Sequence, residues 1–251
     1  MILILSDIHF GEHTASFERA KEQALLSCLH YYQPSVEALY LVGDVYHCYL
    51  EYRHLIPRGF VRFQATLAHW HELGIPVYYL LGNHDPWHLS YFKEELGVQI
   101  IPEQLLTTHY QHRLLFTHGD RLLVEEGFRH TFKGWIRKPW VYALYRGLLP
   151  ADTGIALAHL VSKRFGKKEL DGTRIVQLRE KAKILLQRHA IDGVIMGHSH
   201  APALEKMTHG FYLNPGYWGD EQTYALLDRD HVQLCRWQEK HPEVLQTLPL
   251  Q

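Results

Sequence analysis

The sequence predicts an α/β fold in which a core of strands and helices is interrupted by a helical insertion. Short apolar, β-prone segments alternate with segments of helical spacing in the first half of the chain, as is typical of layered α/β domains with a largely buried sheet. The apolar segments also stop abruptly at Asp, Asn or His. The chain has 251 residues, of which 46% are hydrophobic, so it is long enough for one sizeable core. We therefore expect a single domain over residues 1–251.

The expected elements are short strands separated by helices or turns. Apolar spacing indicates helices at 17–31 and 60–72. Strands are expected at 1–6, 38–42, 76–81, 98–101, 113–117, 193–196, 203–206, 211–213, 223–228 and 231–236, with a hairpin turn at 228–230. Between 121 and 190 no strand is evident and helix formers dominate. We place the helical insertion over these residues.

Composition excludes several classes of protein. The net charge of -1 disfavours a globally basic nucleic-acid-binding protein, so no nucleic acid partner is expected. The three cysteines form no close pairs, which argues against a disulfide framework and fits a reducing, cytoplasmic compartment. The first residues lack a basic region and indicate a strand rather than a signal peptide. No apolar run approaches the roughly 18 residues of a membrane span, so we expect a protein that is soluble or at most bound to a membrane surface.

Five motifs share one arrangement, in which an apolar strand is followed at once by Asp, His or Asn. They are Asp7-x-His9, Gly43-Asp44, Gly82-Asn83-His84-Asp85, His118-Gly119-Asp120 and Gly197-His198-x-His200. Because the carboxyl ends of strands line the ligand crevice of an open α/β sheet, we expect these five clusters to converge. Carboxylate and imidazole together select borderline divalent ions such as Mn, Fe, Co or Zn. Each motif alone is common at strand ends, but their joint order predicts a dinuclear metal site.

The order D-x-H, G-D, G-N-H-D, H-G, G-H-x-H resembles that of the calcineurin-like metallophosphoesterases over almost the whole chain. The resemblance implies a four-layer α/β/β/α sandwich with a helical cap and two divalent ions, Mn²⁺ being the first candidate. One ion would take Asp7, His9, Asp44 and His200, and the other would take Asp44, Asn83, His118 and His198. Asp44 would then bridge the two ions.

The same resemblance implies a hydrolase of phosphoesters or phosphoanhydrides. Two ions in such a site clamp the phosphoryl oxygens and lower the pKa of a bound water. His84 matches the residue that donates to the developing charge or to the leaving oxygen. We expect its neighbour Asp85 to orient the imidazole and to keep it cationic.

Within this superfamily the chain is most similar to the enzymes that hydrolyse UDP-2,3-diacylglucosamine to lipid X and UMP in lipid A synthesis. His118-Gly119-Asp120, the acidic Glu126 eight residues after the His, and the helical insertion carry the similarity. The segment 217–220, Tyr-Trp-Gly-Asp, adds a loose match. Two features depart from that family, which usually has Arg at the position of His84 and lacks the Asn-Pro-Gly found at 214–216.

The insertion combines apolar and basic residues. Aromatic and aliphatic side chains between 132 and 170 are mixed with Lys and Arg, a composition that suits a lipid with an anionic headgroup at a membrane surface. Lys167 and Lys168, together with Ser162, are candidates for phosphate contact, and the resemblance adds Glu126 as a candidate for substrate contact. The leading hypothesis is a cytoplasmic pyrophosphohydrolase of a nucleotide-linked lipid in peripheral contact with the inner membrane. Aromatic residues at helical spacing are equally typical of an ordinary core, with the basic residues as a solvated face.

Three other functions fit parts of the sequence. A soluble phosphatase or phosphodiesterase would act on nucleotides or phosphoproteins with the same metal site. A non-catalytic scaffold with this fold would have lost ligands, whereas all seven ligand positions and His84 are present. A nucleic-acid exonuclease would use the basic aromatic face of the insertion, but the near-neutral net charge disfavours it. The sequence leaves the oligomeric state open.

Overall fold

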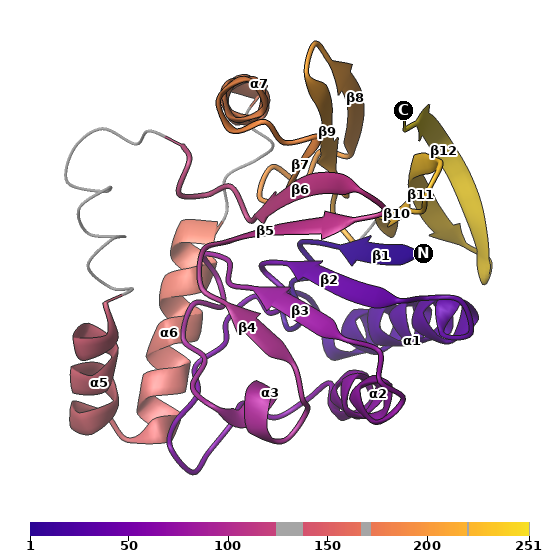
Figure 1. Cartoon of the computed structure of the whole chain (residues 1–251). Helices are drawn as coiled ribbons and strands as arrows, with labels where there is room; N and C mark the ends of the chain where they lie inside the picture. Colours follow the sequence, from indigo (N-terminus) through magenta and orange to yellow (C-terminus); the bar gives the residue numbers. More distant parts are fainter. Residues whose placement is uncertain (124–137, 167–171, 220, 251) are drawn as a thin grey trace.

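Two sheets form the centre of the protein (Figure 1). The computed structural model describes residues 1–123, 138–166, 172–219 and 221–250. The side chains of 163–166 and 189 are not among the described parts. The seven-stranded sheet has the order β12-β11-β10-β1-β2-β3-β4 and the five-stranded sheet the order β5-β6-β7-β9-β8. The first contains β1 (Ile2–Leu5), β2 (Ala38–Val42), β3 (Val77–Leu80), β4 (Gln99–Ile101), β10 (Thr223–Leu227), β11 (His231–Gln238) and β12 (His241–Pro249). The second contains β5 (Gln104–His109), β6 (His112–Thr117), β7 (Gly193–Met196), β8 (Ala203–Met207) and β9 (Gly210–Asn214).

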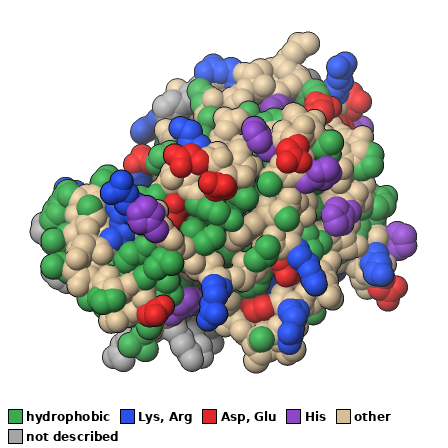
Figure 2. Space-filling view, turned by 90° about the horizontal axis from the view of Figure 1, so that it is seen from below, with side chains coloured by type: hydrophobic (Ala, Val, Ile, Leu, Met, Phe, Trp, Pro, Cys, Tyr) green, Lys and Arg blue, Asp and Glu red, His purple; other side chains and the backbone are tan. Residues whose placement is uncertain are grey.

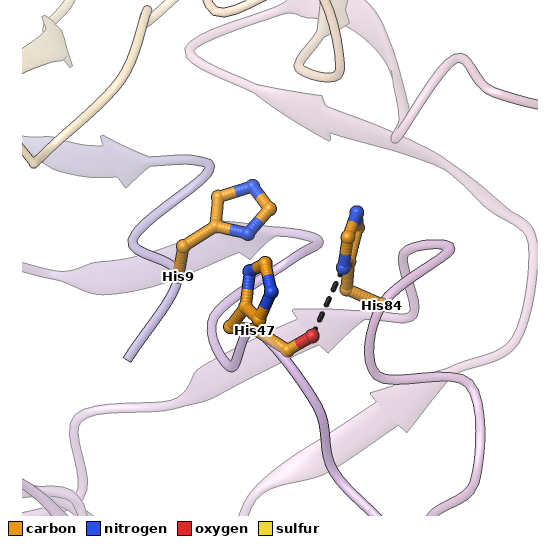
Figure 3. Close-up of side chains that lie close together, drawn as sticks. All are labelled: His9, His47 and His84. Carbon is orange, nitrogen blue, oxygen red and sulfur yellow. Dashed lines mark hydrogen bonds between the residues drawn. The ribbon is translucent and has the colours of Figure 1, made fainter. Parts of the chain in front are cut away.

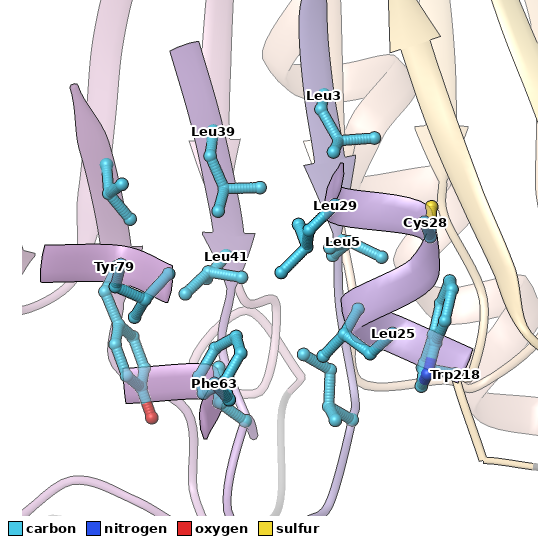
Figure 4. Close-up of a cluster of buried hydrophobic side chains, with 14 of the residues drawn as sticks. Leu3, Leu5, Leu25, Cys28, Leu29, Leu39, Leu41, Phe63, Tyr79 and Trp218 are labelled. Carbon is cyan, nitrogen blue, oxygen red and sulfur yellow. The ribbon is translucent and has the colours of Figure 1, made fainter. Parts of the chain in front are cut away.

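Helices α1 (Ala15–Tyr32) and α2 (Val61–Glu72) cover the outer face of the seven-stranded sheet. Leu25, Cys28 and Leu29 recur at helical spacing on α1 and form one apolar stripe. This stripe packs against alternate residues of the central strands, among them Leu3 and Leu5 of β1 (Figure 4). The period of two in β1 therefore sends these leucines toward the helices and the intervening residues toward the second sheet.

The second core lies between the two sheets. Ile2 and Ile4 of β1 pack there with Phe116 of β6, and the Phe116 ring stacks on Tyr40 of β2 at 4.1 Å between ring centroids. Helix α7 (Gly172–His189) covers the far face of the five-stranded sheet through Leu178 and its apolar neighbours. The predicted four-layer α/β/β/α sandwich is confirmed.

The expected insertion, 121–190, contains helices of two kinds. Helix α7 belongs to the core, because it connects the parallel strands β6 and β7 and packs on them. Helices α5 (Pro139–Leu148) and α6 (Ala151–Gly166) stand beside the layers (Figure 1). They join the core through a small apolar cluster formed by Tyr142 and Ala158 with Cys48 and Leu50. We refer to α5 and α6 as the cap helices.

Strands β5 and β12 were not expected from the sequence, and the hairpin turns that join them to β6 and β11 explain why. Tyr110 and Gln111, between β5 and β6, have φ angles of +51° and +73°. Glu239 and Lys240, between β11 and β12, have φ angles of +48° and +67°. Two-residue hairpin turns of this kind usually contain Asn or Gly. Neither turn carries that signal, whereas the expected hairpin between β10 and β11 is confirmed. Helix α3 (Tyr91–Glu94) is a single short turn before β4.

Candidate metal centre

Five strand ends bring the predicted ligands together. Three belong to parallel strands of the first sheet, β1, β2 and β3, and two to parallel strands of the second, β6 and β7. The residues that follow these strands form two groups. Within each group the ligand atoms all lie within 4.8 Å of one another. The first group is Asp7, His9 and His200, and the second is Asp44, His118 and His198. Asn83 is adjacent to the second group.

The distances place Asp44 between the two groups. In the first group His200 Nε2 lies 3.3 Å from Asp7 Oδ1 and 3.1 Å from His9 Nε2. In the second group His118 Nε2 lies 3.2 Å from Asp44 Oδ2 and 3.3 Å from Asn83 Oδ1. The same Asp44 Oδ2 lies 3.7 Å from His9 Nε2, which belongs to the first group. One carboxylate oxygen therefore faces both groups, as a bridging ligand would.

The donor atoms of the site fit divalent cations. Asp7 Oδ2 accepts hydrogen bonds from Ser6 Oγ at 2.6 Å and from the His198 backbone N–H at 2.9 Å. The buried Oδ1 of Asp7 has no hydrogen-bond partner among the described residues and faces the imidazoles. His118 Nδ1 donates to the carbonyl of Val42 at 2.8 Å, so its Nε2 lone pair points into the site. An oxygen without a partner beside oriented imidazoles is the arrangement that a metal ion completes.

The backbone of the site is unusual in conformation. Five of the predicted ligands have positive φ angles, a region that side-chain-bearing residues rarely adopt. These angles are +49° for Asp7, +49° for His9, +51° for Asp44, +67° for His198 and +57° for His200. Such backbone strain concentrates at functional sites, where the surrounding structure maintains it.

Glycines next to the ligands allow this close packing. A Cβ atom on Gly82 would lie 2.0 Å from Asp44 Oδ1, and one on Gly43 would lie 2.4 Å from His118 Nδ1. A Cβ atom on Gly197 would lie 2.0 Å from Ser6 Oγ, the hydroxyl that orients Asp7. The glycines in the strand-end motifs are therefore needed for space.

Electrostatics favour the metal-binding protonation states of Asp44, His9 and His198, whereas Asp44 raises the pKa of His118 and Asp7 raises the pKa of His200 against the opposing effect of burial. Burial by itself would raise the pKa of Asp44, but the neighbouring imidazoles of His118 and His84 outweigh it and hold that pKa well below its usual range. Burial lowers the pKa of His198 to about 4 and also lowers the pKa of His9. A carboxylate and neutral imidazoles are the forms that coordinate divalent ions.

Asp85 does not act on His84 as the sequence led us to expect. Its carboxylate oxygens accept hydrogen bonds from the backbone N–H groups of Asp44, Val45, Tyr46 and Gly82, at 3.3, 2.7, 3.3 and 2.9 Å, and from the hydroxyl of Tyr79. The expectation that Asp85 orients the imidazole was wrong, because the tight turn directs this side chain into the protein. Asp85 instead ties the loop that follows β2 to the loop that follows β3. Burial and the nearby charge of Asp44 raise the pKa of Asp85 to about 6.

His84 lies at the edge of the two ligand groups. Its backbone N–H donates to Asp44 Oδ1 at 2.8 Å, and its ring Nδ1 lies 2.9 Å from the carbonyl oxygen of His47 and 3.0 Å from Ser162 Oγ. His9, His47 and His84 form a third group with ligand atoms within 4.8 Å (Figure 3). Sequence reasoning missed His47, although it follows Asp44 by only three residues.

A second layer of contacts supports His200. The ring of Tyr217 stacks on the His200 ring at 5.0 Å with an interplanar angle of 6°. The Tyr217 hydroxyl donates to Glu12 Oε2 at 3.0 Å. Glu12 was also missed, since nothing in its local sequence indicates the contact. Among the candidates for substrate contact, Ser162 touches the site, whereas Glu126, Lys167 and Lys168 lie outside the described residues.

Comparisons with known proteins identify a matching family, similar sequences and a similar fold. A family profile described as Calcineurin-like phosphoesterase matches residues 1–202. A UDP-2,3-diacylglucosamine hydrolase of Porphyromonas gingivalis is 28% identical over 176 residues, which cover 66% of this chain and 65% of that protein. A protein of the same name from Escherichia coli O6:H1 is 24% identical over 249 residues, covering 94% of this chain and 98% of that protein. The solved structure of Yfce, a phosphoesterase from E. coli, shares the fold with a TM-score of 0.52 and 17% identity, covering 100% of this chain and 99% of that one.

Proposed function

Because the chain belongs to the calcineurin-like phosphoesterase family and is a metal-dependent phosphoesterase, we propose that it cleaves the pyrophosphate of UDP-2,3-diacylglucosamine, giving lipid X and UMP. The observation that carries this proposal is the pair of cap helices beside a complete set of metal ligands. The name of the E. coli relative, which aligns along 98% of its length, supports the substrate.

The proposed ligands are the seven residues predicted from the strand-end motifs. Asp7, His9, Asp44 and His200 would hold one ion, and Asp44, Asn83, His118 and His198 would hold the other. Two divalent ions, of which Mn²⁺ is our first candidate, would neutralise the phosphoryl oxygens and activate water for attack. Within this site Asp44 faces both groups, and the hydrogen bond of His118 Nδ1 to Val42 leaves Nε2 as the ring nitrogen that would hold an ion.

His84 is the proposed catalytic residue. Its Nδ1 is engaged by a backbone carbonyl, so its Nε2 is the ring nitrogen available to the phosphoryl group or the leaving oxygen. An imidazole is suited to this role because its ring nitrogens can both donate and accept a proton. Asp85 contributes by holding the turn that carries both Asn83 and His84.

The cap helices offer an apolar surface for the acyl chains. Leu144 and Leu148 on α5 are 54% and 71% exposed, and Trp140 one turn earlier is 52% exposed. Leu157 and Leu160 on α6 add to this surface. Hydrophobic side chains gather on the lobe at the left of Figure 2, which corresponds to these helices. An exposed apolar surface of this kind is typical of lipid or membrane contact, and we propose peripheral contact with the cytoplasmic face of the inner membrane.

No helix among the described residues is long and apolar enough to cross a bilayer. We propose that contact with a lipid is made through the exposed apolar side chains of the cap helices. Ser162 lies on α6, the helix that carries Leu157 and Leu160, and its Oγ lies 3.0 Å from His84 Nδ1.

The test is a comparison of two substrates with purified, Mn²⁺-loaded protein. We expect UMP release from UDP-2,3-diacylglucosamine to exceed phosphate release from nucleotides by orders of magnitude, and Asp44→Ala to abolish both. Trp140→Ser with Leu144→Ser should reduce turnover of the lipid but leave hydrolysis of a small chromogenic phosphodiester intact. Faster hydrolysis of nucleotides, or indifference of the lipid reaction to acyl chains and mild detergent, would contradict the lipid proposal.

A soluble phosphodiesterase is the second candidate, and two residues favour it. His84 replaces the Arg usual in the UDP-2,3-diacylglucosamine hydrolases, and Asn214 stands in a segment that those enzymes lack. The buried Asn214 amide donates to the Gly197 carbonyl at 3.0 Å and to Ser199 Oγ at 2.8 Å, so it braces the loop that carries His198. This brace is independent of any lipid.

A further inference from the structure

A hydroxyl group of the cap reaches the proposed catalytic imidazole. Ser162 on α6 donates from Oγ to the carbonyl oxygen of His47 at 2.7 Å, and the same Oγ lies 3.0 Å from His84 Nδ1. His84 Nδ1 also lies 2.9 Å from that carbonyl oxygen. Three polar atoms from three separate segments therefore meet within hydrogen-bonding distance of one another.

Hydrogen-bonding chemistry assigns the protons in this triangle. A carbonyl oxygen only accepts, so His84 Nδ1 must carry the hydrogen that it directs to His47. Ser162 gives its single hydrogen to the same carbonyl, which leaves an oxygen lone pair facing the His84 N–H. The Nδ1 hydrogen of His84 is thus held between two acceptors. Nε2 is then the ring nitrogen that exchanges a proton with the substrate.

Of the three polar atoms, only Ser162 Oγ belongs to the cap helices. The carbonyl of His47 is fixed by the core, since the His47 N–H donates to the Phe10 carbonyl at 3.0 Å and the Tyr49 N–H donates to the His84 carbonyl at 3.3 Å. Ser162 instead depends on the docking of α6, which the apolar cluster around Tyr142 and Ala158 provides. The position of α6 therefore determines whether His84 has its second acceptor.

We propose that Ser162 is a positioning residue that makes the orientation of the His84 ring depend on the docked cap helix. This inference rests on the proposed catalytic role of His84 and gives the cap a task besides lipid contact. Its consequence is that the cap helices matter for every substrate, including one too small to touch their apolar surface.

The test uses a small chromogenic phosphodiester, bis(p-nitrophenyl) phosphate, with the Mn²⁺-loaded full chain. We expect Ser162→Ala to lower kcat about tenfold while KM changes less than about twofold, because a group that orients an acid or base acts on the chemical step. Ser162→Thr retains the hydroxyl and should restore most of kcat. Thr153→Ala removes an exposed hydroxyl from the same helix and should leave kcat unchanged.

The split between kcat and KM and the rescue by Ser162→Thr separate positioning from a structural defect. A folding defect would lower stability in urea and Mn²⁺ affinity together with kcat, whereas Ser162→Ala should leave both at wild-type values. Loss of turnover with the diacylated substrate alone, at unchanged kcat for the diester, would overturn the inference and make Ser162 a lipid contact. If His84→Gln itself keeps full activity, the catalytic assignment of the proposed function fails. If His84→Gln is inactive and Ser162→Ala is normal, only the present inference fails.

Discussion

Replacing Asp85 with Asn tests whether this residue braces two loops or acts on its neighbour His84. The substitution keeps the shape of the side chain and exchanges one acceptor oxygen for an NH₂ group. Each carboxylate oxygen of Asp85 now accepts from two backbone N–H groups, and one of them also accepts from the hydroxyl of Tyr79. Whichever way the amide turns, its NH₂ group faces at least two donors that are left without an acceptor.

The size of the effect follows from this count. Two unpaired backbone donors and the amide itself cost roughly 1–3 kcal/mol each when buried. Removing a buried carboxylate whose pKa is raised to about 6 from 3.8 returns about 3 kcal/mol at neutral pH. We expect a net loss of about 3 kcal/mol at pH 7. The raised pKa of Asp85 also determines how the stability difference between the two proteins changes with pH. Below pH 6 the folded wild type takes up a proton at Asp85, which stabilises it, whereas Asp85→Asn cannot. The difference in stability should therefore widen as the pH falls from 6 toward 4.

Urea unfolding of the metal-free protein measures the stability, and calorimetric titration with Mn²⁺ measures the affinity. Both should fall, since Asp44 and Asn83 lie on the two braced loops. Asp228→Asn is the matched control, because Asp228 accepts two backbone N–H groups at 2.8 Å in an exposed turn, where we expect less than about 1 kcal/mol. A variant Asp85→Asn with wild-type stability and Mn²⁺ affinity but no turnover would refute the bracing role and restore the expected action on His84.

Three further predictions follow from single contacts. Gly82→Ala should abolish tight Mn²⁺ binding in calorimetry, because its Cβ would lie 2.0 Å from Asp44 Oδ1; wild-type affinity would show that the loop yields without cost. Burial lowers the pKa of His88 to about 3, so the unfolded state alone gains a proton below pH 6.5 and stability falls with the pH. At pH 5 this loss is about 2 kcal/mol, and urea unfolding of His88→Phe should show a flatter profile; an unchanged slope would contradict this account. Gly154→Val should displace Tyr52, whose hydroxyl lies against Gly154, and thereby increase proteolysis of the cap helices while lowering diester turnover. Intact protection from proteases would count against it.

The convergence of the candidate metal ligands was predictable because each motif is local. A strand followed by a ligand can be recognised within six residues, and the sheet then gathers the ligands without further information. Contacts made across loops left no such signal, as with Glu12 and His47. The role of Asp85 was wrong because neighbours in a tight turn point in different directions.

In the fold, too, features with a local sequence signal were predicted and features without one were missed. The four layers were expected, but α7 was assigned to the insertion because its helical spacing is the same whether the helix covers a sheet or a ligand. Strands β5 and β12 escaped detection because their turns lack glycine. The sequence named Ser162 only as a candidate for phosphate contact, because its contacts with His47 and His84 are made by residues distant in the chain.

The place of β1 in its sheet has a consequence for how the protein is made. Strand β1 precedes the other described strands in the sequence, yet it lies in the interior of the sheet between β2 and β10. Its pairing with β2 can form early, whereas its other edge waits until residue 227 has left the ribosome. An open edge next to apolar side chains invites pairing with other chains. Products of interrupted translation that stop before β10 should therefore be prone to aggregation. In the full chain, the pairing of β10 with β1 covers this open edge.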